Sequence, residues 1–106
     1  MPLLAAARAE AGSGKPFPEV VKTFGLSCAL PGALQNAVAG AGAFAGRYAD
    51  GVRANIMAGG DNCSRSVLLG ALLAAAEGGA AAVPAEWAAK TSRFAEIEAL
   101  AAKLVA

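Results

Sequence analysis

Apolar residues recur along most of the chain at the three- and four-residue spacing of helices that bury one face. The clearest case is Phe94, Ile97, Ala101 and Leu104, which repeat at spacings of three, four and three. No window alternates between apolar and polar residues as a half-buried strand would. The pattern therefore predicts an all-α fold, with no internal repeat and no long linker.

Glycine and proline divide the rest of the chain into further predicted helices. These are residues 2–11, residues 18–24, a helix starting at Pro31, a helix capped by Asp50, residues 65–77 and a short helix starting at Pro84. Asp is favoured as an N-cap because its carboxylate accepts a first-turn N–H. Thr91 and Ser92 are expected to cap the last helix in the same way.

Two features indicate how these helices pack. Residues 65–77 are apolar on every side, which is typical of a helix at the centre of a core. The helix from Pro31 carries Gly40, Gly42 and Gly46, which are expected to let a neighbouring helix come close. Aromatic residues make up only 6% of the chain, so the core must be built from small aliphatic side chains.

Composition and charge exclude several classes of protein. Hydrophobic residues make up 57% and charged residues 16%, which is too apolar for a disordered chain. The net charge is +1 and there is no basic stripe, so nucleic-acid binding by phosphate neutralisation is not expected. No apolar stretch reaches the length of a membrane span, and the N-terminus lacks the basic segment of a signal peptide. We therefore expect a cytoplasmic protein with no membrane partner.

The chain has no histidine and only two cysteines, Cys28 and Cys63. Zinc sites with mixed cysteine and histidine ligands are excluded, and an all-thiolate site would need twice as many cysteines. A Ser-His or Cys-His catalytic pair is excluded as well. Both cysteines are expected to be reduced and to be buried as small apolar residues.

A possible phosphate-binding loop, Gly12-Ser13-Gly14-Lys15, matches its motif only in part. Position 9 is Ala where the first Gly belongs, and Lys15 is followed by Pro16 in place of Ser or Thr. We therefore expect a plain connecting loop in this segment.

The candidate chemistry of the chain lies in one short segment, Gly59-Gly60-Asp61-Asn62-Cys63-Ser64. The glycines permit an unusual backbone path, and they deliver Asp61, Asn62 and Ser64 to the start of a helix. These oxygen-bearing side chains suit the shell of a Mg²⁺ ion. The alternative is structural: a glycine pair ends one helix and Asp61 caps the next, and spacing alone favours this interpretation. Arg65 is expected either to pair with Asp61 or to reach a ligand phosphate.

The order of features from residue 50 onward resembles the ADP-ribosylglycohydrolase family. Asn55, near the end of a helix, leads into Gly-Gly-Asp, and a long helix of Ala, Gly and Leu follows. A Pro-x-x-Trp segment, residues 84–87, and a closing amphipathic helix complete the match. With the upstream helix from Pro31, the resemblance covers residues 17–106 and leaves residues 1–16 as an N-terminal helix and loop.

The resemblance implies a helical bundle that forms the C-terminal part of a Mg²⁺-dependent hydrolase. Such an enzyme cleaves ADP-ribose from a protein side chain or a small molecule, and its two Mg²⁺ ions share carboxylates from both ends of the chain. Asp61 matches the first Asp of the family's Gly-Gly-Asp-x-Asp-(Ser/Thr) motif and Ser64 matches the final hydroxyl, so both are expected to be metal ligands. The resemblance further places Gly59, Gly60 and Asn62 beside the substrate.

Two departures from the family motif affect this interpretation. Cys63 stands where the second Asp belongs, and a thiol is a poor ligand for Mg²⁺. The acidic loops of the family's N-terminal half do not occur, and Asp50 and Asp61 are the only Asp residues. We therefore expect a C-terminal fragment, a truncated gene model or a degenerate paralogue. The alternative function is a non-catalytic module, crystallin-like or interacting, and an exposed apolar face is expected to favour self-association.

Overall fold

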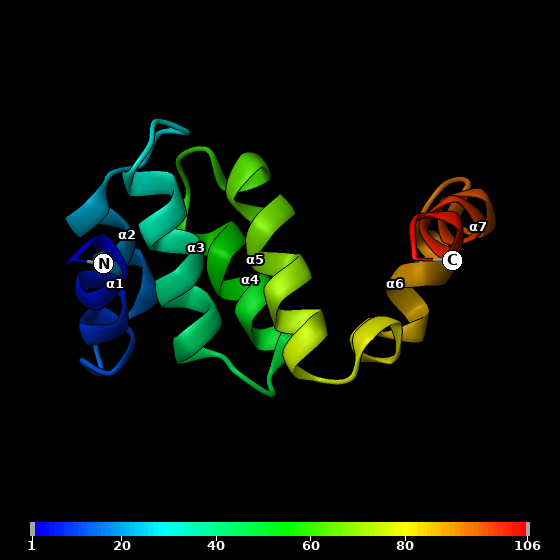
Figure 1. The fold of residues 1–106 in the computed structure, drawn as a ribbon, viewed down its shortest axis with the longest axis horizontal. Coiled ribbons are helices and arrows are strands. Elements are labelled where there is room, and N and C mark those ends of the chain that lie inside the picture. Colours follow the sequence, from blue (N-terminus) through cyan, green and yellow to red (C-terminus); the bar gives the residue numbers. More distant parts are fainter. Residues whose placement is uncertain (1, 106) are drawn as a thin grey trace.

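A computed structural model describes residues 2–105, which form seven α-helices, one short 3₁₀ helix and no strand (Figure 1). In chain order the elements are α1 (Pro2–Ala11), α2 (Phe17–Phe24), α3 (Gly32–Ala43), α4 (Tyr48–Ala58), α5 (Asn62–Ala76), η1 (Gly79–Ala82), α6 (Ala85–Lys90) and α7 (Phe94–Leu104). The predicted all-α fold is confirmed. Within these residues, every helix is too short or too polar to cross a membrane.

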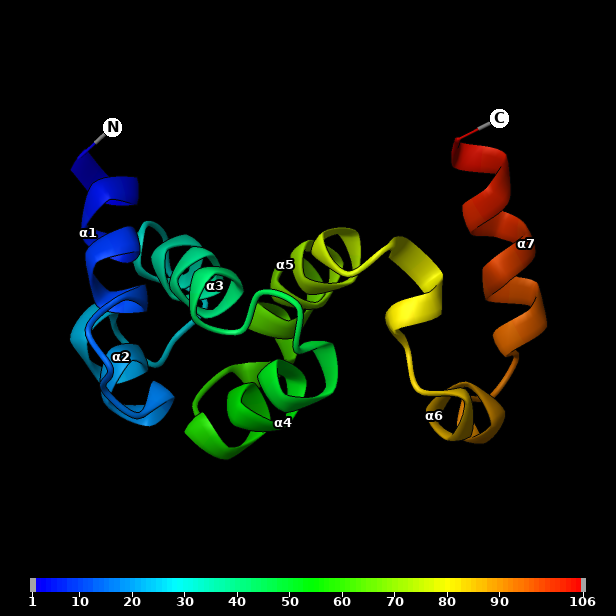
Figure 2. The same cartoon turned by 90° about the horizontal axis from the view of Figure 1, so that it is seen from below.

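The first five helices form the body of the molecule. Helix α3 packs against α1 on one side and α5 on the other, while α2 and α4 form a second layer beneath them (Figure 2). The core between these helices is small and aliphatic, as the composition predicts. Its buried members are Ala7, Phe17, Val20, Val21, Ala37, Ala39, Leu69 and Leu73.

Glycine allows α3 to contact its neighbours closely at two positions. A Cβ atom at Gly40 would lie 2.9 Å from the ring of Phe17 and 3.0 Å from Leu69. A Cβ atom at Gly42 would lie 2.9 Å from that of Ala11 in α1. The predicted role is confirmed for these two residues. Gly46 differs, since it has open space around it and a φ of 76°, and it turns the chain after α3.

A second close contact, at Gly51 in α4, gives a testable prediction. A Cβ atom there would lie 2.5 Å from Cδ1 of Leu73 and 2.9 Å from Cβ of Phe44. Gly51→Ala is expected to lower the free energy of unfolding by about 1 to 2 kcal/mol, because overpacking outweighs the better helix propensity of Ala. Gly70→Ala, in α5 with no atom within 4 Å of its Cβ, is expected to raise it by about 0.5 to 1 kcal/mol. Urea unfolding measures both, and equal changes would contradict the steric argument.

Helix α4 starts earlier than predicted. The sequence places Asp50 at the N-cap, but the helix begins at Tyr48 with Arg47 as its N-cap, so Asp50 lies in the first turn. A contact distant in sequence lies at this end of the helix. The N–H of Tyr48 donates to Oε2 of Glu77, at the end of α5, over 3.3 Å. A carboxylate from another helix thus serves a first-turn amide that the local sequence leaves without an acceptor.

The predicted cap of the last helix is also wrong. Thr91 donates its hydroxyl to the carbonyl of Trp87 over 2.7 Å, so it belongs to the end of α6. The N-cap of α7 is Arg93, at a φ of 59°, and it makes no side-chain capping bond. Its guanidinium instead pairs with Glu96 in the first turn, at 2.6 and 2.7 Å. Ser92 therefore precedes the cap.

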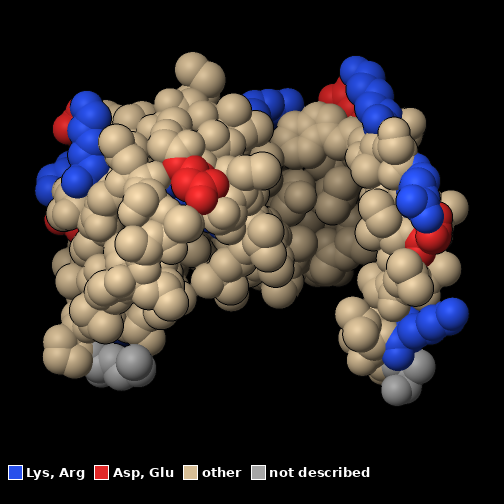
Figure 3. Space-filling view, turned by 90° about the horizontal axis from the view of Figure 1, so that it is seen from above, with Lys and Arg blue, Asp and Glu red and all other residues tan. Residues whose placement is uncertain are grey.

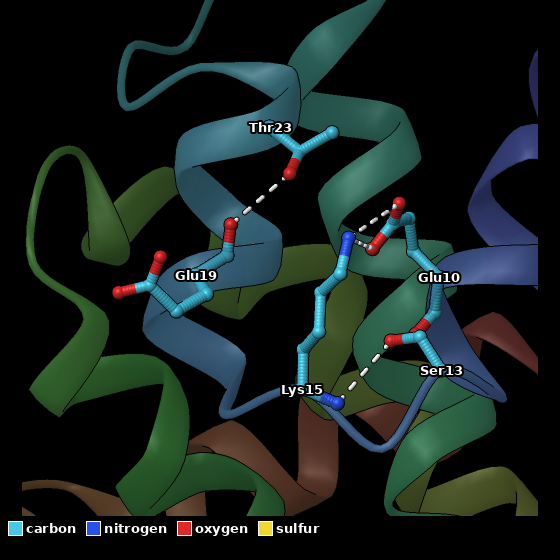
Figure 4. Close-up of polar contacts among 5 residues, drawn as sticks. All are labelled: Glu10, Ser13, Lys15, Glu19 and Thr23. Atoms are coloured by element: carbon cyan, nitrogen blue, oxygen red, sulfur yellow. Dashed lines mark hydrogen bonds and ion pairs between the residues drawn. The ribbon is translucent and has the colours of Figure 1, made fainter.

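The connection between α1 and α2 is held by its own side chains (Figure 4). The Nζ atom of Lys15 lies 3.0 and 3.1 Å from the two carboxylate oxygens of Glu10. Ser13 donates its hydroxyl to the carbonyl of Glu10 over 2.7 Å and accepts the N–H of Lys15 over 3.3 Å. The basic side chain that suggested a phosphate loop is thus paired within the connection.

Helix α5 is buried on one side only, contrary to the prediction of a central helix. Leu69 and Leu73 are fully buried, whereas Val67 is 77% exposed and Leu68 and Leu72 are each more than a third exposed. The chain after α5 does not fold back over this face, because η1, α6 and α7 lead away from the body as an arm (Figures 1 and 2). The apolar residues on the outer side of α5 therefore remain uncovered.

Trp87 in α6 is the main aromatic contact between the arm and the body. Its ring centroid lies 6.2 Å from that of Tyr48, and the guanidinium of Arg53 lies 5.2 Å above the ring. The side chain is only half-buried, so it docks on α4 from outside the core. Helix α7 has no comparable contact, and Ile97, Leu100 and Leu104 are exposed.

Candidate functional site

The loop between α4 and α5 rests on the segment that follows α2. Gly59 and Gly60 have φ angles of 72° and 62°, in the region that favours glycine. A Cβ atom at Gly60 would collide with the carbonyl oxygen of Leu26. That oxygen also accepts the N–H of Asp61 over 2.8 Å. The glycine pair is therefore needed both for the backbone conformation and for close contact with Leu26.

Asp61 is the N-cap of α5. Its Oδ1 accepts the backbone N–H of Ser64 over 3.1 Å, and the helix begins at Asn62, three residues before the predicted start. The bond from the Ser64 N–H lowers the pKa of Asp61 below its usual value, and the Ser64 hydroxyl, Cys28 and the charge of Arg65 act in the same direction. The capping interpretation is thus confirmed, and the carboxylate is held in its ionised form.

A buried hydrogen-bond network fixes the position of this loop. Arg65 and Asn55 are 3% and 0% exposed, and Nε of Arg65 donates to Oδ1 of Asn55. Nη2 of Arg65 donates to the carbonyl of Gly59 over 2.6 Å and to that of Asn55 over 3.2 Å. Nδ2 of Asn55 donates to the carbonyl of Asn62 over 3.0 Å and to Oγ of Ser66 over 2.7 Å. The end of α4, the glycine pair and the start of α5 are therefore joined through two side chains.

This network changes the expected role of Arg65. Among the residues described, its guanidinium hydrogen-bonds to Asn55 and Gly59, and Asp61 acts on it only through its charge. Burial lowers the pKa of Arg65, and the nearby carboxylate of Asp61 opposes that change. The sequence names Asn55 as part of the family pattern but gives it no role. Its position seven residues before Asn62 and ten before Arg65 carries no local signal for such a contact.

An apolar cavity of about 330 Å³ lies beside the capped start of α5. Its lining residues are Cys28, Leu30, Ala33, Leu34, Ala37, Ser64, Arg65 and Leu68. Both cysteines are exposed, so the prediction that they are buried is wrong. Cys28 lies in the irregular segment after α2, and Cys63 lies in the first turn of α5, away from the core.

The loop does not by itself complete a magnesium site. Asp61 offers a carboxylate, and the exposed Ser64 offers a hydroxyl three residues later. Asn62 is half-buried, and its amide donates weakly to the carbonyl of Gly60 over 3.4 Å. Nowhere in residues 2–105 do three Asp, Glu, Cys or His side chains gather where they could hold a metal ion. The oxygen donors suit Mg²⁺ in kind, but a single carboxylate is too little charge for the two-metal centre that the resemblance implies.

The lowered pKa of Asp61 predicts how its charge contributes to stability. Asp61→Asn keeps an N-cap of equal quality but removes the charge, whereas Asp61→Ala removes both. Because the folded-state pKa lies below the unfolded value of 3.8, the charge stabilises the fold above about pH 4, and this contribution is lost as the pH falls through the folded-state pKa. In chelator-treated buffer, the wild type should melt above Asp61→Asn at pH 7, and the difference should shrink towards pH 3. Thermal melts across this range test it, and a difference that grows on acidification would contradict it.

Comparison with known proteins gives the family. The sequence model of the ADP-ribosylglycohydrolase family matches residues 2–106. Crystallin J1A of Tripedalia cystophora is 36% identical over 86 residues, which cover 81% of this chain and 26% of that protein. The chain thus spans about a quarter of the length of this relative, and no solved structure matches it. Because the family model matches almost the whole chain, this chain belongs to the ADP-ribosylglycohydrolase family.

Proposed function

We propose that this chain is part of a hydrolase that cleaves ADP-ribosyl glycosidic bonds with Mg²⁺, and that Asp61 contributes to its site. Family membership supports the class of reaction. The observation that carries the proposal is the fixed, ionised carboxylate of Asp61, since Mg²⁺ binds charged oxygen ligands. In this proposal the substrate is an ADP-ribosylated side chain or a small ADP-ribosyl molecule.

The other residues of the loop have supporting roles in this proposal. Ser64 would add a second oxygen to the metal shell, and the backbone at Gly59 and Gly60, with Asn62, would face the substrate. The residues described supply one carboxylate, so further metal ligands would have to come from outside them. The chain's own contribution is therefore a negative charge that Asn55 and Arg65 hold in place.

A non-catalytic role is the second candidate, and two observations favour it. Cys63 is exposed at the position where the resemblance places a second metal-binding Asp, and a thiol does not replace that ligand for Mg²⁺. The relative at 36% identity is named a crystallin. In this alternative the cap, the glycine pair and the Arg65 network serve only to join α4 to α5.

Calorimetric titration of the chain with MgCl₂ tests the metal role. We expect weak binding that Asp61→Asn reduces at least about tenfold, because one of few charged ligands is lost. Asp61→Asn retains the helix cap, so a loss of binding reports on charge and not on folding. Asp50→Asn removes an exposed carboxylate of α4 that pairs loosely with Arg53 at 3.9 Å, and it should bind Mg²⁺ as the wild type does.

Two outcomes of further measurements favour the non-catalytic candidate. One is an identical titration for the wild type and Asp61→Asn. The other, measured on the chain completed with the acidic loops, is the absence of ADP-ribose release from an ADP-ribosylated peptide with both the wild type and Asp61→Asn. The nucleotide sequence upstream of the Met1 codon is an independent check, because an in-frame extension encoding acidic loops would supply the missing carboxylates.

A further inference from the structure

Asn36 is a fully buried polar side chain whose hydrogen bonds lead to the end of another helix. It lies in the second turn of α3 and is 0% exposed. Its Nδ2 donates to the carbonyl of Gly25 over 2.8 Å and reaches that of Val21 at 3.5 Å. Gly25 ends α2 with a φ of 111°, so the amide of Asn36 holds the backbone at the residue where α2 stops.

The segment that follows Gly25 has few contacts that fix its position. Residues 26–31, which connect α2 to α3, are all exposed. Among the residues described, two backbone carbonyls of residues 25–31 accept hydrogen bonds from groups more than four positions away. That of Gly25 accepts from Asn36, and the next one, that of Leu26, accepts the N–H of Asp61 over 2.8 Å. The two bonds therefore act on consecutive carbonyls of one exposed segment.

The oxygen of the Asn36 amide makes no such contact. Oδ1 is buried and accepts no hydrogen bond from the part of the chain that the structure describes. An unpaired buried acceptor is unfavourable, and an apolar side chain would avoid it. The contribution of this amide is therefore its donor, which an apolar residue would not supply to Gly25.

Charge is sparse where this segment meets the α4–α5 loop. Residues 25–31 and 59–62 contain one charged side chain, that of Asp61. Figure 3 looks onto this end of the body, the upper end in Figure 1, and the middle of that face carries one acidic patch in largely uncharged surroundings. Coulomb attraction falls with distance, so the binding of a cation here depends on where a single carboxylate lies.

We infer that Asn36 is a positioning residue for Asp61, which acts through the backbone of Gly25 and Leu26. Its donor fixes the end of α2 and with it the direction of the Leu26 carbonyl, which holds the N–H of Asp61. The network within the α4–α5 loop holds Asp61 from one side, and Asn36 holds it from the side of α2. The positioning itself needs no metal, whereas its effect on Mg²⁺ rests on the proposed function.

Amide hydrogen exchange of the 106-residue chain tests the positioning in the absence of metal. Asn36→Ala removes the donor to Gly25, and we expect the N–H of Asp61 to exchange at least about tenfold faster, because its acceptor becomes mobile. Gln35→Ala is the matched control. Gln35 is the adjacent buried amide on α3, 8% exposed, and it donates over 3.2 Å to the carbonyl of Leu3 in α1. This control should leave the exchange of Asp61 within about twofold of the wild type.

Two additions separate positioning from a general loss of stability. The N–H of Leu69, which is fully buried in α5, exchanges through opening of the body and so reports overall stability in each variant. Asn36→Thr nearly keeps the volume of Asn, and a Thr hydroxyl in a helix bonds back to a carbonyl of its own helix. This variant therefore removes the donor to Gly25 with little change in packing, and it should accelerate Asp61 as Asn36→Ala does.

Calorimetric titration with MgCl₂ extends the test to the proposed site. Asn36→Ala should weaken Mg²⁺ binding at least about threefold, and Gln35→Ala should not change it. A wild type that binds no Mg²⁺ contradicts the proposed function, and the exchange rates then decide the role of Asn36.

Three outcomes of the exchange experiment overturn the inference. One is unchanged exchange of Asp61 in both Asn36 variants, and another is an equal acceleration in Gln35→Ala. The third is loss of the whole fold in both Asn36 variants, because the residue would then hold the body together and not position the segment after α2.

Discussion

Asn55→Ala is expected to lower the free energy of unfolding by about 3 kcal/mol, because it breaks a buried hydrogen-bond network around a charged side chain. The variant leaves Nε of the buried Arg65 without its acceptor. It also removes the donor to the carbonyl of Asn62 and to Ser66. A small domain has only about 5 to 15 kcal/mol of stability, so the melting temperature should fall by well over 10 °C.

A double-mutant cycle shows whether this loss comes from the network. Arg65→Met keeps most of the length of the side chain and removes the charge. The double variant Asn55→Ala with Arg65→Met no longer contains the guanidinium that Asn55→Ala leaves without an acceptor. Its loss of unfolding free energy should therefore be smaller than the sum of the two single losses, by about 1 to 3 kcal/mol. Strictly additive losses would show that the two side chains act independently.

Asn62→Ala is the matched control for the Asn55 variant. Its side chain is half-buried and makes one weak bond within the loop, at 3.4 Å to the carbonyl of Gly60. Its own backbone carbonyl, which accepts from Asn55, remains in the variant. The change should therefore stay within about 0.5 kcal/mol, and urea unfolding of the three proteins gives the comparison.

Gly60→Ala is the second substitution with a large expected effect, also about 3 kcal/mol. An alanine at a φ of 62° is strained by about 1 to 2 kcal/mol wherever it occurs. Here the new methyl would also collide with the backbone of Leu26, which cannot move without breaking its hydrogen bond to Asp61. The variant should therefore loosen the segment after α2 together with the start of α5.

Gly59→Ala separates these two costs. Gly59 has a similar φ of 72°, but a Cβ atom there meets nothing within 4 Å. Its ψ of −156° lies in a region that is essentially restricted to glycine, so its loss should be limited to a backbone strain of about 1 to 3 kcal/mol and should stay below that of Gly60→Ala. Urea unfolding of both variants measures the difference. Equal losses would mean that Leu26 gives way easily and that the loop is not fixed by this contact.

These contacts bear on the proposed function because they determine where the Asp61 carboxylate lies. The charge itself comes from one residue, but its position depends on Leu26, Asn55 and Arg65. A metal role for Asp61 therefore predicts that Gly60→Ala weakens Mg²⁺ binding even though it leaves every oxygen ligand in place. In the non-catalytic alternative, the same variant affects stability alone.

The sequence by itself determined the features that depend on near neighbours in the chain. Helical spacing predicted an all-α fold, and glycine pairs marked the ends of α4 and α5 correctly. The capping role of Asp61 was readable because its partner, Ser64, is three residues away. The family was identified from the order of short motifs, and the family match confirms it. Metal and substrate roles for Asp61, Ser64 and the neighbouring loop residues stay predictions.

Only the tertiary structure decided the features that depend on contacts distant in sequence. At the start of α4, Glu77 accepts the N–H of Tyr48 from 29 residues away, and the role of Asn55 depends on Arg65, ten residues later. The exposed face of α5 could not be read from its composition, because burial depends on whether another helix covers a surface. A helix that is apolar on every side can be buried on any of its sides. The path of the chain after Ala76 determines which side of α5 is covered.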